Sequence, residues 1–495
     1  MLDRNNVQVL YSPYSLFKIL MLQILLFFFL NIPTASGTEI PSINRSEKIQ
    51  SDTTSQFVVV DKVFIIGNKK TKAQIITREL DFKINDTIWS IQLNAKLLEN
   101  KNRIFNLGLF TEVDLNVIYL SKERVDIVVS LKERWYTFPV PIFKLADRNF
   151  NDWWENQNGD LKRVDYGLKF YQFNMRGRNE RLRLTGQFGF NKLFDLQYSI
   201  PYIDKNQING LSIFTTYAEN NSIAFQTVDH KLIFLNTDTK MRQAFRTGLT
   251  LSRRQSFFSY HYLTLAYYHR AISDTIAALN PNYFLKSRTR QEFLYLNYKF
   301  KRDLRNIAAY PLKGYLLNFE VEKSGLGLKG DINLLQVSGN YSRYIDLGKH
   351  YYLSSKLSTA MSFPKVQPYN NFTSLGYSQE FIRGYELYVV EGQNYFLNKT
   401  TFKKLLFSGK SVNSLIPFEQ FQTIPFAVYL KSYFDLGYVN NNMVYPLNTR
   451  LSNQYLFGGG MGLDIVTYYD FVLRLEYSVN SIKEKGFFIA VNAEF

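Results

Sequence analysis

Apolar and polar residues alternate along most of the chain from about residue 140 onward. In the run 470–480, apolar side chains take every second position, and polar residues such as Arg474 and Glu476 take the positions between them. Strict two-residue periodicity predicts β-strands with one apolar and one polar face. Alternating runs of about ten residues are typical of membrane β-barrels, which contact lipid outside and water inside.

The alternation predicts roughly sixteen antiparallel strands, and an even number agrees with bacterial single-chain barrels. They are placed at 164–175, 179–190, 192–200, 209–218, 226–236, 241–253, 257–270, 291–300, 313–323, 332–346, 349–362, 394–404, 425–437, 454–466, 470–480 and 486–495. An even count also returns both ends of the barrel to the side on which the chain enters. The segment 405–424 fits poorly, because it is long where a short turn is expected.

Residues 57–135 follow a different pattern, which predicts a compact α+β domain ahead of a barrel over 136–495. The expected order is a strand, two helices and two strands, at 57–66, 71–80, 93–107, 110–119 and 125–131. Gly67 ends the first strand and Gly108 ends the second helix. The chain is therefore expected to be mostly β, with one small mixed domain.

The first 37 residues predict a secretory signal peptide, because about a dozen apolar residues follow Lys18 and lead to a small-residue site before Gly37. The polar residues 38–56 are expected to be a linker. No later stretch has the ~18 uncharged apolar residues of a membrane-spanning helix.

Composition narrows the picture further. The 495 residues are 46% hydrophobic and 16% aromatic, include no cysteine and carry a formal charge of +17. The lack of cysteine excludes a disulfide framework and a lipid-anchored start. The basic residues are scattered, which favours a basic channel lining or contact with acidic lipid headgroups over binding of nucleic acid.

The sequence predicts no enzyme, and no catalytic residue, metal or cofactor. The histidines His230, His261, His269 and His350 have no metal-ligand spacing and no neighbouring nucleophile motif. The glycines of 325–330 match a dinucleotide-binding fingerprint by letter, but they lie between two predicted strands, so a hairpin loop is expected there.

Several short motifs resemble one family. Segments of the N-terminal domain resemble the periplasmic POTRA module, at 66–71, 103–110 and 125–129. Segments of the barrel resemble a turn, a strand and a glycine-rich strand of the Omp85 superfamily, namely Arg302-Asp303-x-Arg305 with Pro311 and Gly314, the run 434–439 and the run 458–463. With the Arg-Gly-Tyr loop at 383–385, the chain resembles the bacterial surface antigen D15 type, which is BamA–TamA-like, with a single POTRA domain.

The resemblance implies a role for Arg383, Gly384 and Tyr385, because the loop arginine of this family reaches into the barrel lumen. A buried guanidinium needs a carboxylate to offset its desolvation. Asp435 is the natural partner, since alternation places it on the polar face. The strand after the loop offers no second acid, so either Arg383 makes one pair or Glu391 substitutes. A solvated surface loop is the alternative.

The final run of the chain looks like the C-terminal recognition signal of outer-membrane barrels, with Phe487, Ile489, Val491 and Phe495 on one face. The alternative is the last strand of a soluble sandwich. A strand containing Tyr166 and Gly167 is expected to come first in the barrel and to form a weakly paired seam with this last strand.

The resemblance implies an outer-membrane assembly or translocation factor with its N-terminal domain in the periplasm. It would accept unfolded outer-membrane or secreted polypeptides by strand addition and insert or pass them through the seam or lumen. Outer-membrane lipids, periplasmic chaperones or accessory lipoproteins are the other expected partners. The alternative is a polypeptide-secretion pore or a passive channel without insertase activity.

Overall fold

The computed structural model describes residues 55–145, 163–327, 331–372, 374–377, 380–412, 419–442, 448, 450–467 and 469–491. The chain divides into two compact units, with the boundary between Arg134 and Trp135. The predicted signal peptide, nearly all of the linker and Phe495 lie outside the described residues. In the described part of the chain, no helix has the length and apolar character needed to cross a membrane.

The first unit is a four-stranded sheet with two helices, in the strand order β2-β1-β4-β3. Its elements are β1 (Phe57–Ile66), α2 (Ala73–Thr77), β2 (Thr87–Trp89), α3 (Ser90–Asn106), β3 (Phe110–Tyr119) and β4 (Arg124–Glu133). Leu93, Leu97 and Ile104 of α3 are buried, as the apolar period of this helix predicts. The predicted α+β domain is therefore present, with the three-residue strand β2 as an addition.

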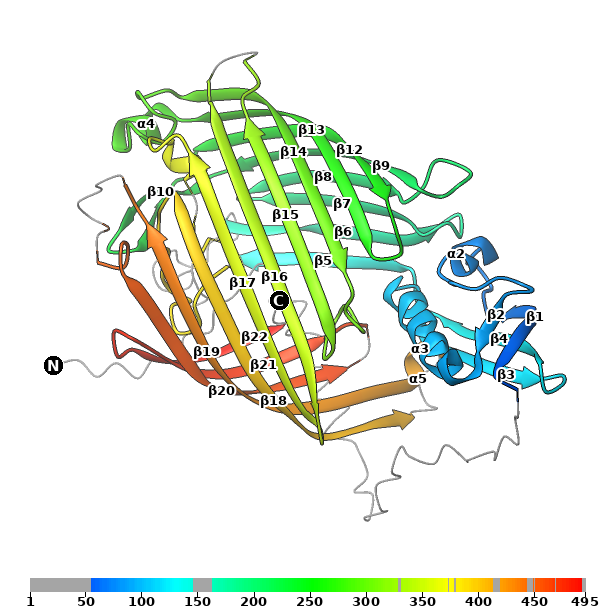
Figure 1. Ribbon diagram of the computed structural model, residues 1–495. Coiled ribbons are helices and arrows are strands. Elements are labelled where there is room, and N and C mark those ends of the chain that lie inside the picture. The colour runs from blue at the N-terminus through cyan, green and yellow to red at the C-terminus, as the bar shows by residue number, and fades with distance from the viewer. Residues whose placement is uncertain are drawn as a thin grey trace. The chain divides into compact units, whose positions relative to one another are not determined.

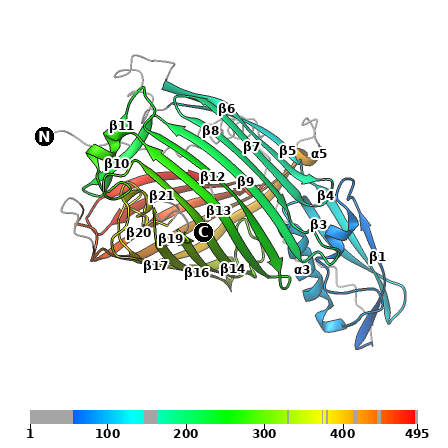
Figure 2. The ribbon, with the colours of Figure 1, turned by 90° about the horizontal axis from the view of Figure 1, so that it is seen from above.

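The second unit is an antiparallel sheet of sixteen strands that curls into a barrel (Figures 1 and 2). Its strands are β5 (Thr137–Leu145), β6 (Val164–Met175), β7 (Glu180–Gly189), β8 (Lys192–Ile200), β9 (Asn209–Asn220), β12 (Arg242–Arg254), β13 (Ser259–Ile272), β14 (Arg290–Asp303), β15 (Gly314–Ser324), β16 (Leu334–Gly348), β17 (Tyr351–Phe363), β18 (Asn394–Val412), β19 (Thr423–Asn440), β20 (Tyr455–Thr467), β21 (Val472–Asn480) and β22 (Lys485–Val491). The predicted fold class is confirmed.

The predicted number of barrel strands is right, although one strand was missed and one segment was wrongly assigned to the barrel, so the two errors cancel in the count. The first barrel strand is β5, which pairs with β6 along its whole length. Its prolines, Pro139 and Pro141, hide it from strand prediction, because proline lacks a backbone donor and is tolerated mainly on edge strands. Tyr166 and Gly167 therefore lie on the second strand of the barrel and not on the first.

The predicted strand 226–236 is not part of the barrel. It contributes to a separate hairpin of β10 (Ser222–Val228) and β11 (Lys231–Asn236). Asp229 and His230 form its turn, with φ of 46° and 60°. Two successive residues with positive φ are usual in tight hairpin turns, where Asn-Gly or Asp-Gly is expected. Without a glycine, the turn reads as a continuous strand.

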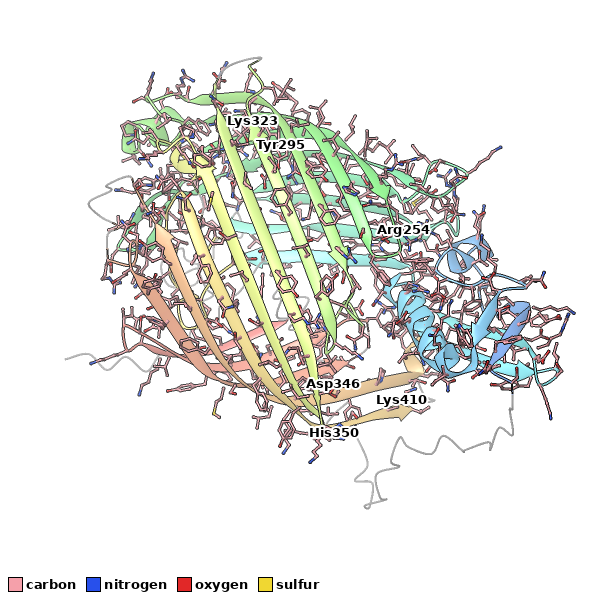
Figure 3. All side chains as sticks on the ribbon, viewed as in Figure 1. Arg254, Tyr295, Lys323, Asp346, His350 and Lys410 are labelled. Atoms are coloured by element: carbon pink, nitrogen blue, oxygen red, sulfur yellow. The ribbon has the colours of Figure 1, made fainter. Side chains whose placement is uncertain are left out.

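The long segment 405–424 is largely strand. β18 and β19 pair as far as Val412 and Thr423, whereas β17 pairs with β18 only as far as Lys404. The hairpin therefore projects beyond its neighbour. Figure 3 shows Lys410 at the same end of the strands as Asp346 and His350, with Tyr295 and Lys323 towards the opposite end. Strand parity makes the projecting end the one at which the chain enters the barrel.

Candidate functional site

The connection between β17 and β18 folds against the inner face of the barrel wall. It contains the short helix η3 (Tyr369–Asn371) and is closed by a bridge between Leu375 and Val390. Ile382 and Tyr385 pack there in a buried apolar cluster with residues of β18, β19 and β20. The predicted lumen loop between the eleventh and twelfth strands therefore lies inside the barrel.

Arg383 and Asp435 form the centre of this loop's attachment to the wall, and both side chains are fully buried. The guanidinium donates to the carboxylate through Nε at 2.9 Å and Nη2 at 2.5 Å. The backbone N–H of Arg383 donates to the same carboxylate at 2.9 Å. Nη1 donates to the hydroxyl of Thr401 at 3.0 Å, and the guanidinium lies 3.9 Å from the ring centroid of Tyr433. The predicted partner is thus brought into contact with Arg383.

Gly384 and Tyr385 join the loop to the last hairpin of the barrel. Gly384 has φ of +96°, which a residue with a side chain rarely adopts. Its carbonyl accepts a hydrogen bond of 2.7 Å from Asn480, and the Tyr385 hydroxyl lies 2.7 Å from the hydroxyl of Ser481. Glu386 accepts from the Gly384 N–H at 2.8 Å, and burial raises the pKa of its carboxyl to about 7.

A second acid does interact with Arg383, but it comes from β21. Glu476 is buried and interacts electrostatically with Arg383, Lys431 and Arg474. Lys431 lies between two carboxylates, 2.5 Å from Asp464 and 2.7 Å from Glu476. The lumen therefore contains a chain of buried opposite charges. Alternation placed Glu476 on the polar face, but its partner depends on how the barrel curves.

Glu391 does not substitute as a partner of Arg383. Its carboxylate accepts hydrogen bonds from Thr227 at 2.7 Å, from Tyr377 at 2.5 Å and from Asn448 at 3.3 Å. Burial raises its pKa. These partners belong to the β10–β11 hairpin, the β17–β18 connection and the β19–β20 connection, which meet at the end of the barrel opposite the chain's entry. We call this group of segments the cap, and Glu391 holds them together.

The predicted turn motif joins β14 to β15. Arg305 donates to both oxygens of Asp303, at 2.8 and 2.7 Å, which fixes the start of the turn. Arg302 is exposed, Pro311 is buried, and Gly314 opens β15. The same turn carries Tyr310 into the lumen, where its hydroxyl donates to Asp464 at 2.8 Å. The sequence did not predict this contact, which ties the turn to the buried charges.

His230, in the turn of the β10–β11 hairpin, is fully buried in the cap. The backbone N–H of Leu451 donates to its Nε2 at 2.9 Å, and its Nδ1 lies 3.3 Å from the carbonyl of Val389. This arrangement requires a neutral ring with its proton on Nδ1. Burial accordingly lowers the pKa of His230.

Acid should loosen this cap. Because the pKa of His230 is lower in the folded protein, its stabilising effect is complete above its ordinary pKa of about 6.5 and is lost as pH falls towards the lower folded value. We expect lower hydrogen-exchange protection factors in 222–236 at pH 5 than at pH 7.5, once the pH dependence of the intrinsic exchange rate is removed. His230→Gln should remove most of this pH dependence, since its amide can donate and accept but does not titrate. Equal pH dependence in both proteins would contradict the prediction.

The last strand and the seam differ from the rest of the sheet. Phe487 and Ile489 of β22 are exposed on the outer face, as the predicted C-terminal signal requires, and Phe495 lies outside the described residues. Between the described residues of β5 and β22 there is no strand pairing. Tyr469, in the β20–β21 turn, instead contacts the start of β5 through Phe138 and the backbone N–H of Trp135.

Comparisons with protein families identify the class. Residues 174–486 match the Omp85 superfamily domain, and residues 58–134 match the surface antigen variable number repeat, which is a POTRA domain. Because the first match covers more than half of the chain, the protein belongs to the Omp85 superfamily. The resemblance to the Omp85 superfamily with a single POTRA domain, found from short motifs, is therefore confirmed. Members of this family are outer-membrane transporters or insertases that handle polypeptides.

Solved structures with a similar fold share little sequence. BamA from Haemophilus ducreyi lacking POTRA domains 1–3 is 16% identical, with 88% of this chain and 84% of that chain covered and a TM-score of 0.47. CdiB from Acinetobacter baumannii is 16% identical, with 88% and 73% covered and a TM-score of 0.45. CdiB from Escherichia coli is 12% identical, with 97% and 98% covered and a TM-score of 0.45. A search of curated proteins finds no match.

Proposed function

We propose that this protein is an assembly or translocation factor of the bacterial outer membrane, with its POTRA domain in the periplasm and unfolded polypeptides as its clients. The observation that carries the proposal is the seam between β5 and β22, whose described residues form no strand pairing. An unpaired strand edge can template the addition of a client strand.

The composition of the two edge strands supports a seam that opens. β5 contains two prolines, which remove two backbone donors. The described part of β22 has seven residues, whereas β18 and β19 have 19 and 18. Tyr469 contacts the start of β5 through the ring of Phe138 and the backbone N–H of Trp135, which is not a strand pairing. Separating the two strands would therefore break few backbone hydrogen bonds.

The filled lumen argues against the alternative of a passive channel. The loop holding Arg383, the inward turn with Tyr310 and the cap around His230 all lie within or over the barrel. Each is fixed by buried polar contacts, which are costly to break. Electrical recordings should therefore show a mostly closed barrel, whereas a large steady pore would favour the channel.

A disulfide across the seam tests the proposal, and the chain's lack of native cysteine makes the test clean. Val140→Cys on β5 and Phe488→Cys on β22 place thiols on the inner faces of the edge strands. Oxidation should abolish the folding of a client barrel in liposomes that contain the protein, and reduction should restore it. Full client-folding activity with the disulfide formed would contradict the proposal.

A second disulfide supplies the matched control. Ser199 and Ser212 face each other in the β8–β9 ladder. This ladder is expected to stay paired whether the seam between β5 and β22 is open or closed. Ser199→Cys with Ser212→Cys should form a disulfide without loss of client folding. Equal inhibition by both disulfides would show that any cross-link harms the barrel, and the seam would then have no special role.

A further inference from the structure

The inner wall formed by β12 and β13 carries three arginines, none of which makes an ion pair with an acidic residue in the described part of the chain. Arg270 lies opposite Ala244 in the ladder, so Arg242 and Arg246, two positions either side of Ala244, project from the same face and flank it. Arg242 and Arg246 both act electrostatically on Arg270, and Arg242 has the stronger effect. The Nε of Arg242 is buried and has no hydrogen-bond partner.

This arrangement contrasts with that of two fully buried cations of the lumen, which have acidic partners. Arg383 pairs with Asp435, Lys431 with Asp464 and Glu476. A cluster of like charges destabilises a fold unless something else neutralises it. Such clusters mark sites where an opposite charge is expected to bind.

Arg270, the central arginine of the three, borders a cavity of about 240 Å³. Its lining includes Arg270, Tyr295, Glu322 and Gln336 of the wall, with Asn370 and Asn371 of η3. Figure 3 marks Tyr295 on this part of the barrel. The volume is below the roughly 300–1,000 Å³ of drug-sized ligand sites, so it suits a single ring with its substituents.

The walls of the cavity combine two kinds of surface. Tyr268 and Phe293 stack with ring centroids 5.1 Å apart, and the guanidinium of Arg270 lies 5.2 and 5.4 Å from their centroids. The carboxylate of Glu322, the amides of Gln336, Asn370 and Asn371, and the hydroxyls of Ser324 and Tyr295 add polar groups to the lining. Tyr283 is buried nearby, where it interacts with Arg242 and Arg270, and its hydroxyl donates to Asn370 at 3.3 Å.

We propose that this cavity binds an acidic or phosphorylated sugar. The guanidiniums would hold the anionic group, for which their fork geometry is suited. The amides and Glu322 would bind the hydroxyls, and the aromatic side chains would contact the ring. The anion can come from a free saccharide or from the headgroup of an outer-leaflet glycolipid. The site is separate from the seam, so it stands independently of the assembly function.

Calorimetry on the full-length protein in detergent tests the site. Glucose 6-phosphate or glucuronate should bind, glucose should bind at least tenfold more weakly, and inorganic phosphate should bind more weakly than glucose 6-phosphate. Arg270→Gln and Arg242→Gln should each weaken binding at least tenfold. Arg253→Gln, on the same strand but on its other face, should bind as the unchanged protein does. Absence of binding, or equal binding by all variants, would overturn the proposal.

Two further measurements complete the test. Nanodiscs with and without lipopolysaccharide distinguish the sources: protection from unfolding only with lipopolysaccharide identifies a headgroup, and competition by glucuronate alone identifies a free sugar. Without ligand, Arg270→Gln or Arg242→Gln should unfold at the same temperature as the unchanged protein or higher, because a repulsion is removed. Marked destabilisation of both variants would assign the arginines a structural role and overturn the proposal.

Discussion

Replacing Arg383 with alanine should cost the barrel about 3–5 kcal/mol of stability, the usual effect of removing one partner of a buried ion pair. The reason is that Asp435 would remain fully buried without its bidentate donor. Whole domains are stable by only about 5–15 kcal/mol, so much of the protein should fail to reach the folded state. The fraction that resists unfolding in cold SDS gels and the urea midpoint measure this.

Two matched variants separate the buried pair from charge in general. Arg450 makes a similar bidentate contact with Asp229, but both side chains are exposed, by 44% and 60%. Arg450→Ala should therefore change stability by less than about 1 kcal/mol. Arg383→Met combined with Asp435→Leu should recover much of the loss, because no buried charge remains unpaired. If Arg383→Ala is as stable as Arg450→Ala, the loop is not a structural support.

The parts of this fold that follow from local periodicity could be predicted from sequence. Alternation assigned Asp435 to the inner face because side chains of a strand change sides at every residue. The same rule put Glu476 on an inner face, but its contact with Lys431 depends on a neighbouring strand and on the curvature of the sheet. No local pattern contains that information.

The errors arose where local signals are misleading. The prolines of β5 read as a loop, although an edge strand tolerates them. The turn at Asp229 and His230 lacks glycine, so 226–236 read as one strand. The cap and the inward course of Tyr310 were not predicted either, because each depends on contacts between segments more than 150 residues apart. Local sequence therefore predicted the wall of the barrel better than its contents.

Replacing Gly458 with alanine should move the loop away from the wall and open the lumen. A Cβ at this position would lie 1.9 Å from the backbone carbonyl oxygen of Arg383, a contact that no side-chain rotation can relieve. β20 can support the loop this closely only because it has no side chain there. We expect large, steady conductance in planar bilayers, where the unchanged protein is mostly closed.

The neighbouring glycine supplies the control. A Cβ on Gly459 would lie no nearer than 3.2 Å to any atom, so Gly459→Ala should conduct as the unchanged protein does. Gly458→Ala retains every charged side chain of the lumen, whereas Arg383→Ala removes one. If both variants open the barrel, the position of the loop closes the lumen, and the ion pair acts by holding the loop in place. If Gly458→Ala stays closed while Arg383→Ala opens, the buried charges themselves block the passage of ions.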